Sequence, residues 1–443
     1  MRILLFIYNF ILIILTPVLS IAGYFVLRRK NKHQHYWERF GFIRIGDFKP
    51  VKSVWFHCAS VGEVRSIKKI VDTLRQDNKD ISIIISTMTA TGRQIAVDYI
   101  KADKAFLLPI ENSRAVSMII SYMNVSVLVI VDTELWPNLI FTASNHIPVF
   151  LINGRISDKT YKTYKRFKFI FKSVLKRFSA IMTKSELDEE RFTNILGKSS
   201  KIITAGNIKF QERKSKDSVK TIKELENIKF FLAASTHKGE EEIILSWFNG
   251  SMEGFDKLIF VPRHIERSEE VKEIIISWFD SEMKGFDKLI FVPRHIERSA
   301  EIKEMIEKQG YSVSLYSEND FSKQVVIIDA FGLLEGLYVL ADKIFIGGSL
   351  KEIGGHNIYE ALQFEKTVAV GKFMFSFKEI FDEAKEFGLV TVINNKEDAL
   401  EFLLGLEKNN NFIDFFNRID KINQDTVSTI TDTINAVINR KGN

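Results

Sequence analysis

From residue 51 onward, short runs of β-branched and apolar residues alternate with segments of helical periodicity. The run "SVWFHCAS" is followed by "EVRSIKKIVDTLRQ", in which apolar residues recur at the spacing of one helix face. The same order of strand and helix returns along most of the chain. Strands that are apolar throughout, each followed by a helix, are typical of a parallel sheet with helices on both faces. The pattern therefore predicts an α/β chain.

One highly charged stretch with few apolar residues, "FQERKSKDSVKTIKELEN", interrupts this pattern. A chain of 443 residues is also too long for a single ordinary core. We therefore expect two doubly wound, Rossmann-like domains, residues 28–209 and 228–410, joined by a linker at 210–227. Ligands would bind at the carboxyl ends of the strands, in a cleft that the two domains face. Residues 1–27 precede the domains, and a helical segment, 411–443, follows them.

The second series of strands contains a tandem repeat. Residues 254–268 recur without a change at 285–299, with a period of 31 residues that covers one strand and one helix. Two copies are too few for a stacked repeat architecture, so we expect an extra unit inserted in an open sheet, within about 245–306. We expect the first copy, which carries Arg263, to keep the inner position. The second copy, which carries Arg294, continues into the downstream helix, and its taking the inner position is the alternative.

The amino end predicts a membrane anchor, because Ile3 to Leu27 holds no charged residue and roughly 20 residues suffice to span a bilayer. Basic residues cluster at 28–32 and, by the positive-inside rule, keep the body of the chain in the cytoplasm. The run is longer than the apolar core of a cleaved signal peptide. Pro17 leaves both a spanning and a monotopic attachment open. The single cysteine, Cys58, excludes an internal disulfide and is typical of a reducing compartment.

One predicted helix is rich in basic residues. The formal net charge of +6 does not by itself indicate binding to nucleic acid. Between Lys159 and Arg177, however, eight basic residues are interleaved with aromatic residues at helical spacing. Such a helix suits anionic lipid head groups or an anionic acceptor, and the alternative is a core stripe with a solvated face. The apolar amino end favours the membrane.

Charged side chains follow several predicted strands of the first domain. Glu63 opens a helix, where the helix dipole favours a carboxylate, and a simple helix cap is the alternative. The stretch "VDTELWPNLI" places Asp132 and Glu134 after a buried strand, either for acid–base chemistry or to position a loop. Arg93 and Arg155 also stand near strand ends. Arginine there suits carboxylate or phosphate ligands, or else a surface ion pair.

In the second domain, "FIGGSLKEIGGHNIYEAL" joins a strand end to a helix start through two glycine pairs. Glycines let backbone amides approach a phosphate, so Gly347, Gly348 and Ser349 are candidate nucleotide ligands. An acid in the following helix, Glu360, can bind ribose hydroxyls. The stretch lacks the lysine of a P-loop and the spacing of the dinucleotide fingerprint. The eight histidines are scattered, so no metal-site spacing is present.

Seven motifs, in order along the chain, resemble the 3-deoxy-D-manno-octulosonic acid (Kdo) transferases of lipid A assembly. They are "ASVGE", "STMTATGR", "TELWPN", "GNIKF", "STHKGEE", "VPRH", and "GGSL" followed by "GGHNIYEA". The resemblance extends from the amino end to about residue 390. It implies a GT-B fold and the transfer of Kdo from CMP-Kdo to a lipid A precursor at the cytoplasmic face of the inner membrane. It implies no cofactor, no metal ion and no nucleic-acid partner.

The resemblance also implies roles for individual residues. Glu63 would be the general base, and Glu134 and Lys209 would stabilise the transition state. The implied contacts with CMP are Pro262, Arg263, Pro293, Arg294, Phe331, Gly332, Leu333, Asn357, Ile358, Tyr359 and Glu360. Of the two copies, we expect the inner first copy, with Arg263, to bind CMP, and the second copy, with Arg294, is the alternative. The chain departs from the family pattern at "FGLLEGLY", at "EALQF" and in its second "VPRH". These departures affect the nucleotide contacts more than the reaction.

The chemistry agrees with these residue types. The departing phosphate of CMP needs charge stabilisation, which arginine, lysine and amide donors supply, and the acceptor hydroxyl needs a base such as a glutamate. One alternative is another GT-B nucleotide-sugar transferase of the cell envelope. A second is a catalytically inactive, membrane-tethered paralogue that binds a nucleotide sugar. The motifs encode neither the number of Kdo units transferred nor the oligomeric state.

Overall fold

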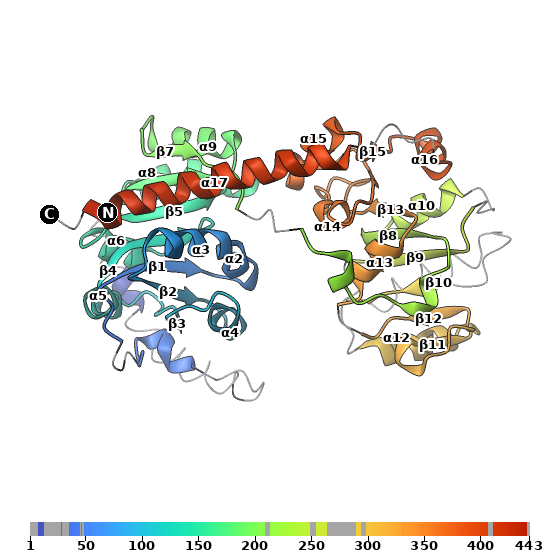
Figure 1. The fold of residues 1–443 in the computed structure, drawn as a ribbon, viewed down its shortest axis with the longest axis horizontal. Coiled ribbons are helices and arrows are strands. Elements are labelled where there is room, and N and C mark those ends of the chain that lie inside the picture. The colour runs from blue at the N-terminus through green and yellow to red at the C-terminus, as the bar shows by residue number, and fades with distance from the viewer. Residues whose placement is uncertain are drawn as a thin grey trace. The chain divides into compact units, whose positions relative to one another are not determined.

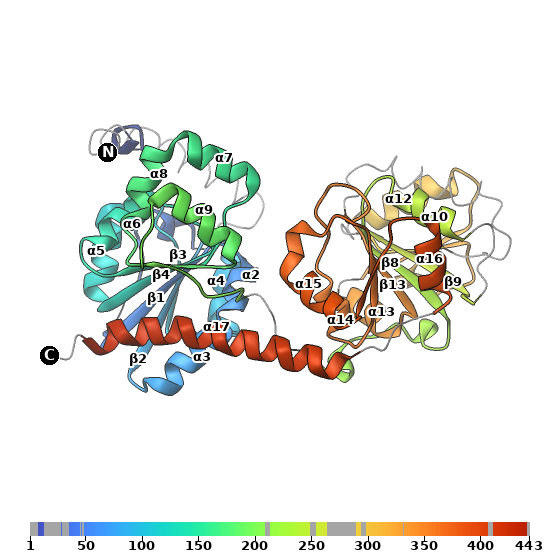
Figure 2. The same ribbon diagram turned by 90° about the horizontal axis from the view of Figure 1, so that it is seen from above.

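The computed structural model describes residues 8–12, 28, 35–44, 46, 48–208, 213–248, 254–263, 289–293, 298–330, 332–405 and 411–440. The chain divides into two compact units. Unit 1 comprises Met1–Gln211 and Ile419–Asn443, and unit 2 comprises Glu212–Arg418. Each unit is built around one parallel sheet (Figures 1 and 2). The two parallel, Rossmann-like sheets confirm the predicted α/β class.

The sheet of unit 1 has seven strands in the order β3-β2-β1-β4-β5-β6-β7. The order reverses direction between β1 and β4, which makes their carboxyl ends the switch point where doubly wound sheets bind ligands. All seven residues of β4 are buried, as expected for a strand covered on both faces. The strands are β1 (Lys52–Cys58), β2 (Ile81–Thr87), β3 (Lys104–Leu107), β4 (Val125–Val131), β5 (Val149–Gly154), β6 (Ala180–Thr183) and β7 (Ile202–Thr204).

Two apolar cores flank this sheet. One contains residues of α5, α6, α8 and α9, and the other contains residues of α2, α3 and α4. Ile430, Ile434 and Ile438 of α17 (Phe412–Arg440) complete the second core, so this long carboxyl-terminal helix covers the same face as α3 (Figure 1). The remaining helices are η1 (Tyr36–Phe40), α2 (Val61–Ser66), α3 (Lys68–Asp77), α4 (Ala90–Asp98), α5 (Ser113–Tyr122), α6 (Pro137–Ser144), α7 (Asp158–Arg166), α8 (Lys168–Leu175) and α9 (Glu186–Leu196).

The sheet of unit 2 has eight strands in the order β11-β12-β10-β9-β8-β13-β14-β15. They are β8 (Phe230–Thr236), β9 (Lys257–Pro262), β10 (Leu289–Phe291), β11 (Val313–Leu315), β12 (Val325–Ile327), β13 (Lys343–Ile346), β14 (Val368–Val370) and β15 (Val390–Val392). The helices are η2 (Lys216–Ser218), η3 (Lys223–Leu225), α10 (Glu241–Trp247), α12 (Ser299–Glu307), η5 (Tyr316–Glu318), α13 (Leu334–Leu340), α14 (Tyr359–Leu362), η6 (Phe375–Phe377), α15 (Lys378–Glu386) and α16 (Lys396–Leu403).

The tandem repeat lengthens this sheet by one strand. β9 comes from the first copy and β10 from the second, and β10 lies between β9 and β12. Every paired residue lies beside its own duplicate: Leu289 pairs with Leu258, Ile290 with Ile259, and Phe291 with Phe260. The first copy keeps the inner position next to β8, as the sequence predicts. An identical strand in the same register preserves the pattern of buried side chains, so the sheet accepts the insertion.

The amino end is described only in part. Most of the expected anchor, Ile3–Leu27, lies outside the described residues, and no helix in the ranges given above is long and apolar enough to cross a membrane. The described turn at residues 8–12 is helical and is hydrogen-bonded to the rest of unit 1. The Asn138 side chain donates to Asn9 Oδ1 at 2.6 Å, and the Tyr8 hydroxyl donates to Glu111.

Candidate functional site

Glu63 lies at the carboxyl end of β1, in the first turn of α2. Its Oε1 accepts a hydrogen bond from Ser60 Oγ at 2.8 Å, and its Oε2 accepts one from the Ala59 amide at 2.6 Å. Ser60 in turn caps the helix by accepting from the Glu63 amide at 3.3 Å. These contacts match the helix cap that the sequence left open as an alternative. They also hold the carboxylate in one orientation at the positive end of a helix.

Glu134 follows β4, the neighbour of β1, and faces the same region. Partial burial raises the pKa of Glu134, and the charges of Glu63 and Asp132 raise it further. A hydrogen bond from Trp136 Nε1, 3.1 Å from Glu134 Oε2, acts in the opposite direction. Tyr164 of α7 lies close enough that burial and the Glu134 charge together raise its pKa to about 12. The switch point of unit 1 therefore holds two interacting carboxylates, Glu63 and Glu134.

Asp132 supports the loop that leads toward residue 209. Asp132 and Asn153 both adopt left-handed backbone conformations, with φ of 57° and 54°, where β4 and β5 end. The Asn153 amide donates to Asp132, and Asn153 Oδ1 accepts from the Ile208 amide at 3.4 Å. This network positions the residue before Lys209, whereas Lys209 itself lies outside the described residues. Asn153 had no motif to single it out, only its place at a strand end before a glycine.

The two candidate arginines of unit 1 have different surroundings. Arg93 Nε lies 3.2 Å from Glu38 Oε2, and the arginine side chain is 19% exposed. The same Glu38 oxygen accepts from the Leu107 amide at 2.8 Å, so Arg93 and Glu38 tie residues 35–44 to β3. This is the ion pair that the sequence left open for Arg93. Arg155 is exposed, and its backbone amide donates to Thr133 Oγ1 at 2.9 Å.

In unit 2, the glycine turn after β13 encloses a carboxylate of the chain itself. Buried Glu240 accepts from the amides of His237 and Gly348 through Oε2, at 2.9 and 2.7 Å. Its Oε1 accepts from the amides of Ser349 and Leu350, at 3.0 and 2.8 Å. The Gly347 amide donates to Ala234 O at 2.8 Å. The amides of Gly347, Gly348 and Ser349, expected to face a phosphate, are therefore engaged within the fold.

Close packing explains why this turn needs glycine. A Cβ at Gly347 would lie 2.5 Å from both Ser235 O and Thr236 Cα, closer than any side chain can approach. Beside the turn, the imidazoles of His237 and His356 stack with an angle of 6° between the rings. Their Nε2 atoms are 2.8 Å apart, so one ring donates a hydrogen bond to the other. The scattered histidines of the sequence gave no sign of this pair.

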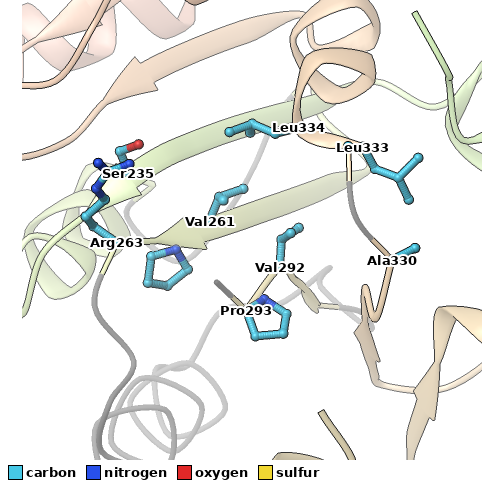
Figure 3. A pocket seen from close by; sticks show the side chains of 10 residues that line it. Ser235, Val261, Arg263, Val292, Pro293, Ala330, Leu333 and Leu334 are labelled. Carbon is cyan, nitrogen blue, oxygen red and sulfur yellow. The ribbon is translucent and has the colours of Figure 1, made fainter. Parts of the chain in front are cut away.

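A pocket of about 250 Å³ opens at the carboxyl ends of four adjacent strands of unit 2 (Figure 3). Ser235 and exposed Arg263 lie on one side of it, and Ala330 and Leu333 lie on the other. The lining residues are Ser235, Val261, Pro262, Arg263, Val292, Pro293, Ala330, Gly332, Leu333 and Leu334. Four predicted ligands besides Arg263 are thus brought together: Pro262, Pro293, Gly332 and Leu333. The predicted ligands Arg294 and Phe331 lie outside the described residues.

Glu360 stands close to Arg263. Solvent reaches its side chain, yet the surrounding protein raises the pKa of Glu360 by desolvation, while Asn357 and Arg263 act in the opposite direction. Asn357 Nδ2 donates to Glu360 Oε1 at 3.4 Å. Ile358 and Tyr359, also predicted ligands, are buried in the core, at 0% and 6% exposure. They place Asn357 and Glu360 rather than present side chains to solvent.

The two constellations suit different chemistry. The carboxylates of unit 1 can accept a proton, whereas the arginine and apolar walls of unit 2 can hold an anionic group joined to a flat ring. Within the described ranges, no cluster of three or more His, Cys, Asp or Glu side chains is arranged to hold a metal ion.

Comparison with known proteins identifies the family to which this chain is similar. A family model described as "3-Deoxy-D-manno-octulosonic-acid transferase (kdotransferase)" matches residues 34–212. The 3-deoxy-D-manno-octulosonic acid transferase of Rickettsia typhi is 30% identical over 372 residues, 81% of this chain and 72% of the relative. A bifunctional glycosyltransferase/methyltransferase of Fusobacterium nucleatum is 31% identical over 376 residues, and the chain spans only 53% of its length.

Among solved structures, the UDP-GlcNAc 2-epimerase from Neisseria meningitidis bound to UDP-GlcNAc is similar in fold. Its TM-score is 0.51 at 12% sequence identity, and the match covers 88% of this chain and 100% of that one. At that identity the likeness concerns the fold alone, which is of the GT-B type.

Proposed function

We propose that this chain, which belongs to the Kdo transferase family of glycosyltransferases, transfers Kdo from CMP-Kdo to a lipid A precursor. The observation that carries the proposal is the pair of interacting carboxylates, Glu63 and Glu134, at the switch point of unit 1. A transferase that uses a sugar hydroxyl as acceptor needs a positioned base, and a fixed carboxylate in a partly buried site meets that need.

In the proposed reaction, the oxygen of the acceptor hydroxyl attacks the anomeric carbon of Kdo, and Glu63 accepts the proton of that hydroxyl. The bond between that carbon and the phosphate oxygen breaks, and CMP departs with the electron pair. Burial and the nearby charges of Glu63 and Asp132 raise the pKa of Glu134, so it holds a proton more readily than a solvated glutamate does. We assign Glu134 and Lys209 to stabilising the transition state, the role that the family resemblance gives them.

We assign CMP to the pocket of unit 2. Arg263 supplies a bidentate donor for the phosphate, and Glu360 with Asn357 supplies acceptor and donor groups for the ribose hydroxyls. The amides of Gly347, Gly348 and Ser349 are engaged by Ala234 and Glu240, so in this proposal they shape the site instead of binding the phosphate.

We further propose that the enzyme is attached to the inner membrane by its amino end, with both units in the cytoplasm. The uncharged run and its basic flank support this. Exposed Phe167, between α7 and α8, and exposed Phe169, in α8, stand among basic residues, a composition suited to an anionic lipid surface. The bonds from Asn138 to Asn9 and from Tyr8 to Glu111 would hold the anchor close to unit 1.

Ligand-dependent unfolding tests the nucleotide assignment. The purified chain is heated alone, with CMP and with UDP, and its melting temperature is recorded. A ligand that binds only the folded state at 100 times its Kd stabilises it by about 2.7 kcal/mol. We expect CMP to raise the melting temperature and UDP to raise it much less. Stabilisation by UDP alone would favour another nucleotide-sugar transferase, and stabilisation by neither would contradict an intact donor site.

A further inference from the structure

We infer that one nucleotide binds across both copies of the repeat, with its phosphate on Arg263 of the first copy and its base on Val292 and Pro293 of the second. This inference rests on the proposed function, because it takes the pocket of unit 2 as the CMP site. It departs from the expectation that a single copy does the binding.

The order of the strands supports placing the phosphate on the first copy and the base on the second. The pocket lies at the ends of β8, β9, β10 and β12, which are consecutive in the sheet. Neighbouring strands are about 4.8 Å apart, so the inserted β10 moves the turn after β12 from one strand spacing to two from the end of β9. Figure 3 shows Val292 and Pro293 in this interval, between Arg263 and Ala330. A nucleotide held at Arg263 therefore meets the second copy before it reaches Gly332 and Leu333.

Duplicate residues differ in exposure. Val261 and Val292 are the same position of the repeat, yet Val261 is only 8% exposed, whereas Val292 is partly exposed. β9 continues to Pro262, and Val261 is paired with Ala234. β10 ends earlier, at Phe291. The Val292 amide still donates to Phe260 O at 3.2 Å, and beyond the strand Val292 and Pro293 line the pocket. At Val292 the second copy thus offers the ligand apolar surface that the first copy largely buries at Val261, whereas Pro262 and Pro293 are both buried residues at the pocket wall.

The pocket is polar on the side of the first copy and apolar on the side of the second. The charge of Arg263 acts on Glu360 and on Tyr338, which places the polar end of the site on the side of the first copy. Val292, Pro293, Ala330 and Leu333, at the other end, carry no polar side chains. A nucleoside monophosphate has the same asymmetry, with an anionic phosphate at one end and a flat, largely apolar base face at the other.

Calorimetric titration of the full chain with CMP and with cytidine separates the two ends. Val292→Ala removes two methyl groups that the base would cover in part, so we expect the Kd of both ligands to rise about fivefold. Arg263→Ala should raise the Kd of CMP at least tenfold and leave that of cytidine unchanged, because cytidine has no phosphate. Val292→Ile keeps the apolar surface and should bind CMP as the natural chain does.

Ile290→Val is the matched control, since it shortens a fully buried side chain of β10, two residues before Val292, that does not line the pocket. It should leave both Kd values unchanged. If the natural chain binds CMP but Val292→Ala has no effect, or no more effect than Ile290→Val, the inference is overturned and the proposed function stands. If the natural chain does not bind CMP, the proposed function itself fails.

Discussion

Glu240→Gln should strongly destabilise unit 2. The Glu240 carboxylate lies between the end of β8 and the glycine turn after β13, and it accepts four backbone hydrogen bonds, two on each oxygen. A glutamine side chain of the same shape keeps one acceptor oxygen and replaces the other with an amide nitrogen. Two of the four backbone donors then face a donor, in a site that the fold buries completely.

The expected loss of stability follows from the two hydrogen bonds that the glutamine cannot accept. A hydrogen bond to a charged group contributes about 1.5–3 kcal/mol, so losing two of them should lower the free energy of unfolding by about 3–6 kcal/mol. The total free energy of unfolding of a domain is commonly only about 5–15 kcal/mol. Unit 2 would therefore be close to unfolding at room temperature, and the turn containing Gly348 would be the first part to open.

Urea unfolding followed by tryptophan fluorescence measures this loss, because Trp247 is buried in the core of unit 2. Glu242→Gln is the matched control: it makes the same chemical change two residues later, at an exposed position, and should alter stability by less than about 0.5 kcal/mol. A loss below about 1 kcal/mol for Glu240→Gln would refute the view that this carboxylate organises the turn.

Three further predictions follow from other parts of the chain. Glu63→Gln should lower kcat by roughly 10²-fold or more and leave the Kd of CMP unchanged, and near-normal turnover would remove Glu63 as the base. Burial raises the pKa of Glu241 from 4.5 to about 7, so the folded chain holds this proton more tightly and loses stability as pH rises through that range. Glu241→Gln should therefore gain about 3 kcal/mol over the natural chain at pH 8 and much less at pH 5, whereas parallel pH curves in urea unfolding would contradict the shift. Deleting one 31-residue period should leave a folded chain, since β9 can then pair with β12 through the same residues that β10 uses; aggregation with loss of the circular dichroism signal would show that the second copy is required.

The sequence predicted the α/β layers well because fully buried parallel strands such as β4 and β8 must be apolar along their whole length. It also predicted the inner position of β9, since an inserted unit disturbs an open sheet least away from its centre. It did not predict that α17 completes the core of unit 1. The periodicity of α17 identifies an apolar face but not the core against which that face packs.

The position of a candidate residue was predictable where the residue follows its own strand directly, as Glu63 and Glu134 do. The glycine turn was misleading for a physical reason: backbone amides that converge on an anion serve a carboxylate as well as a phosphate. Glu240 and Gly348 are 108 residues apart, so no local pattern connects them. A separation of 119 residues likewise concealed the contact between His237 and His356.

The most direct test of the central claim is transfer itself. The purified full chain is incubated in detergent with CMP-Kdo and a tetra-acylated lipid A precursor, and the lipid products are analysed by mass spectrometry beside the release of CMP. The account predicts that the lipid gains whole Kdo units, with one CMP released for each, and that Glu63→Gln stops both. A lipid of unchanged mass, from a folded chain that binds CMP, would contradict it.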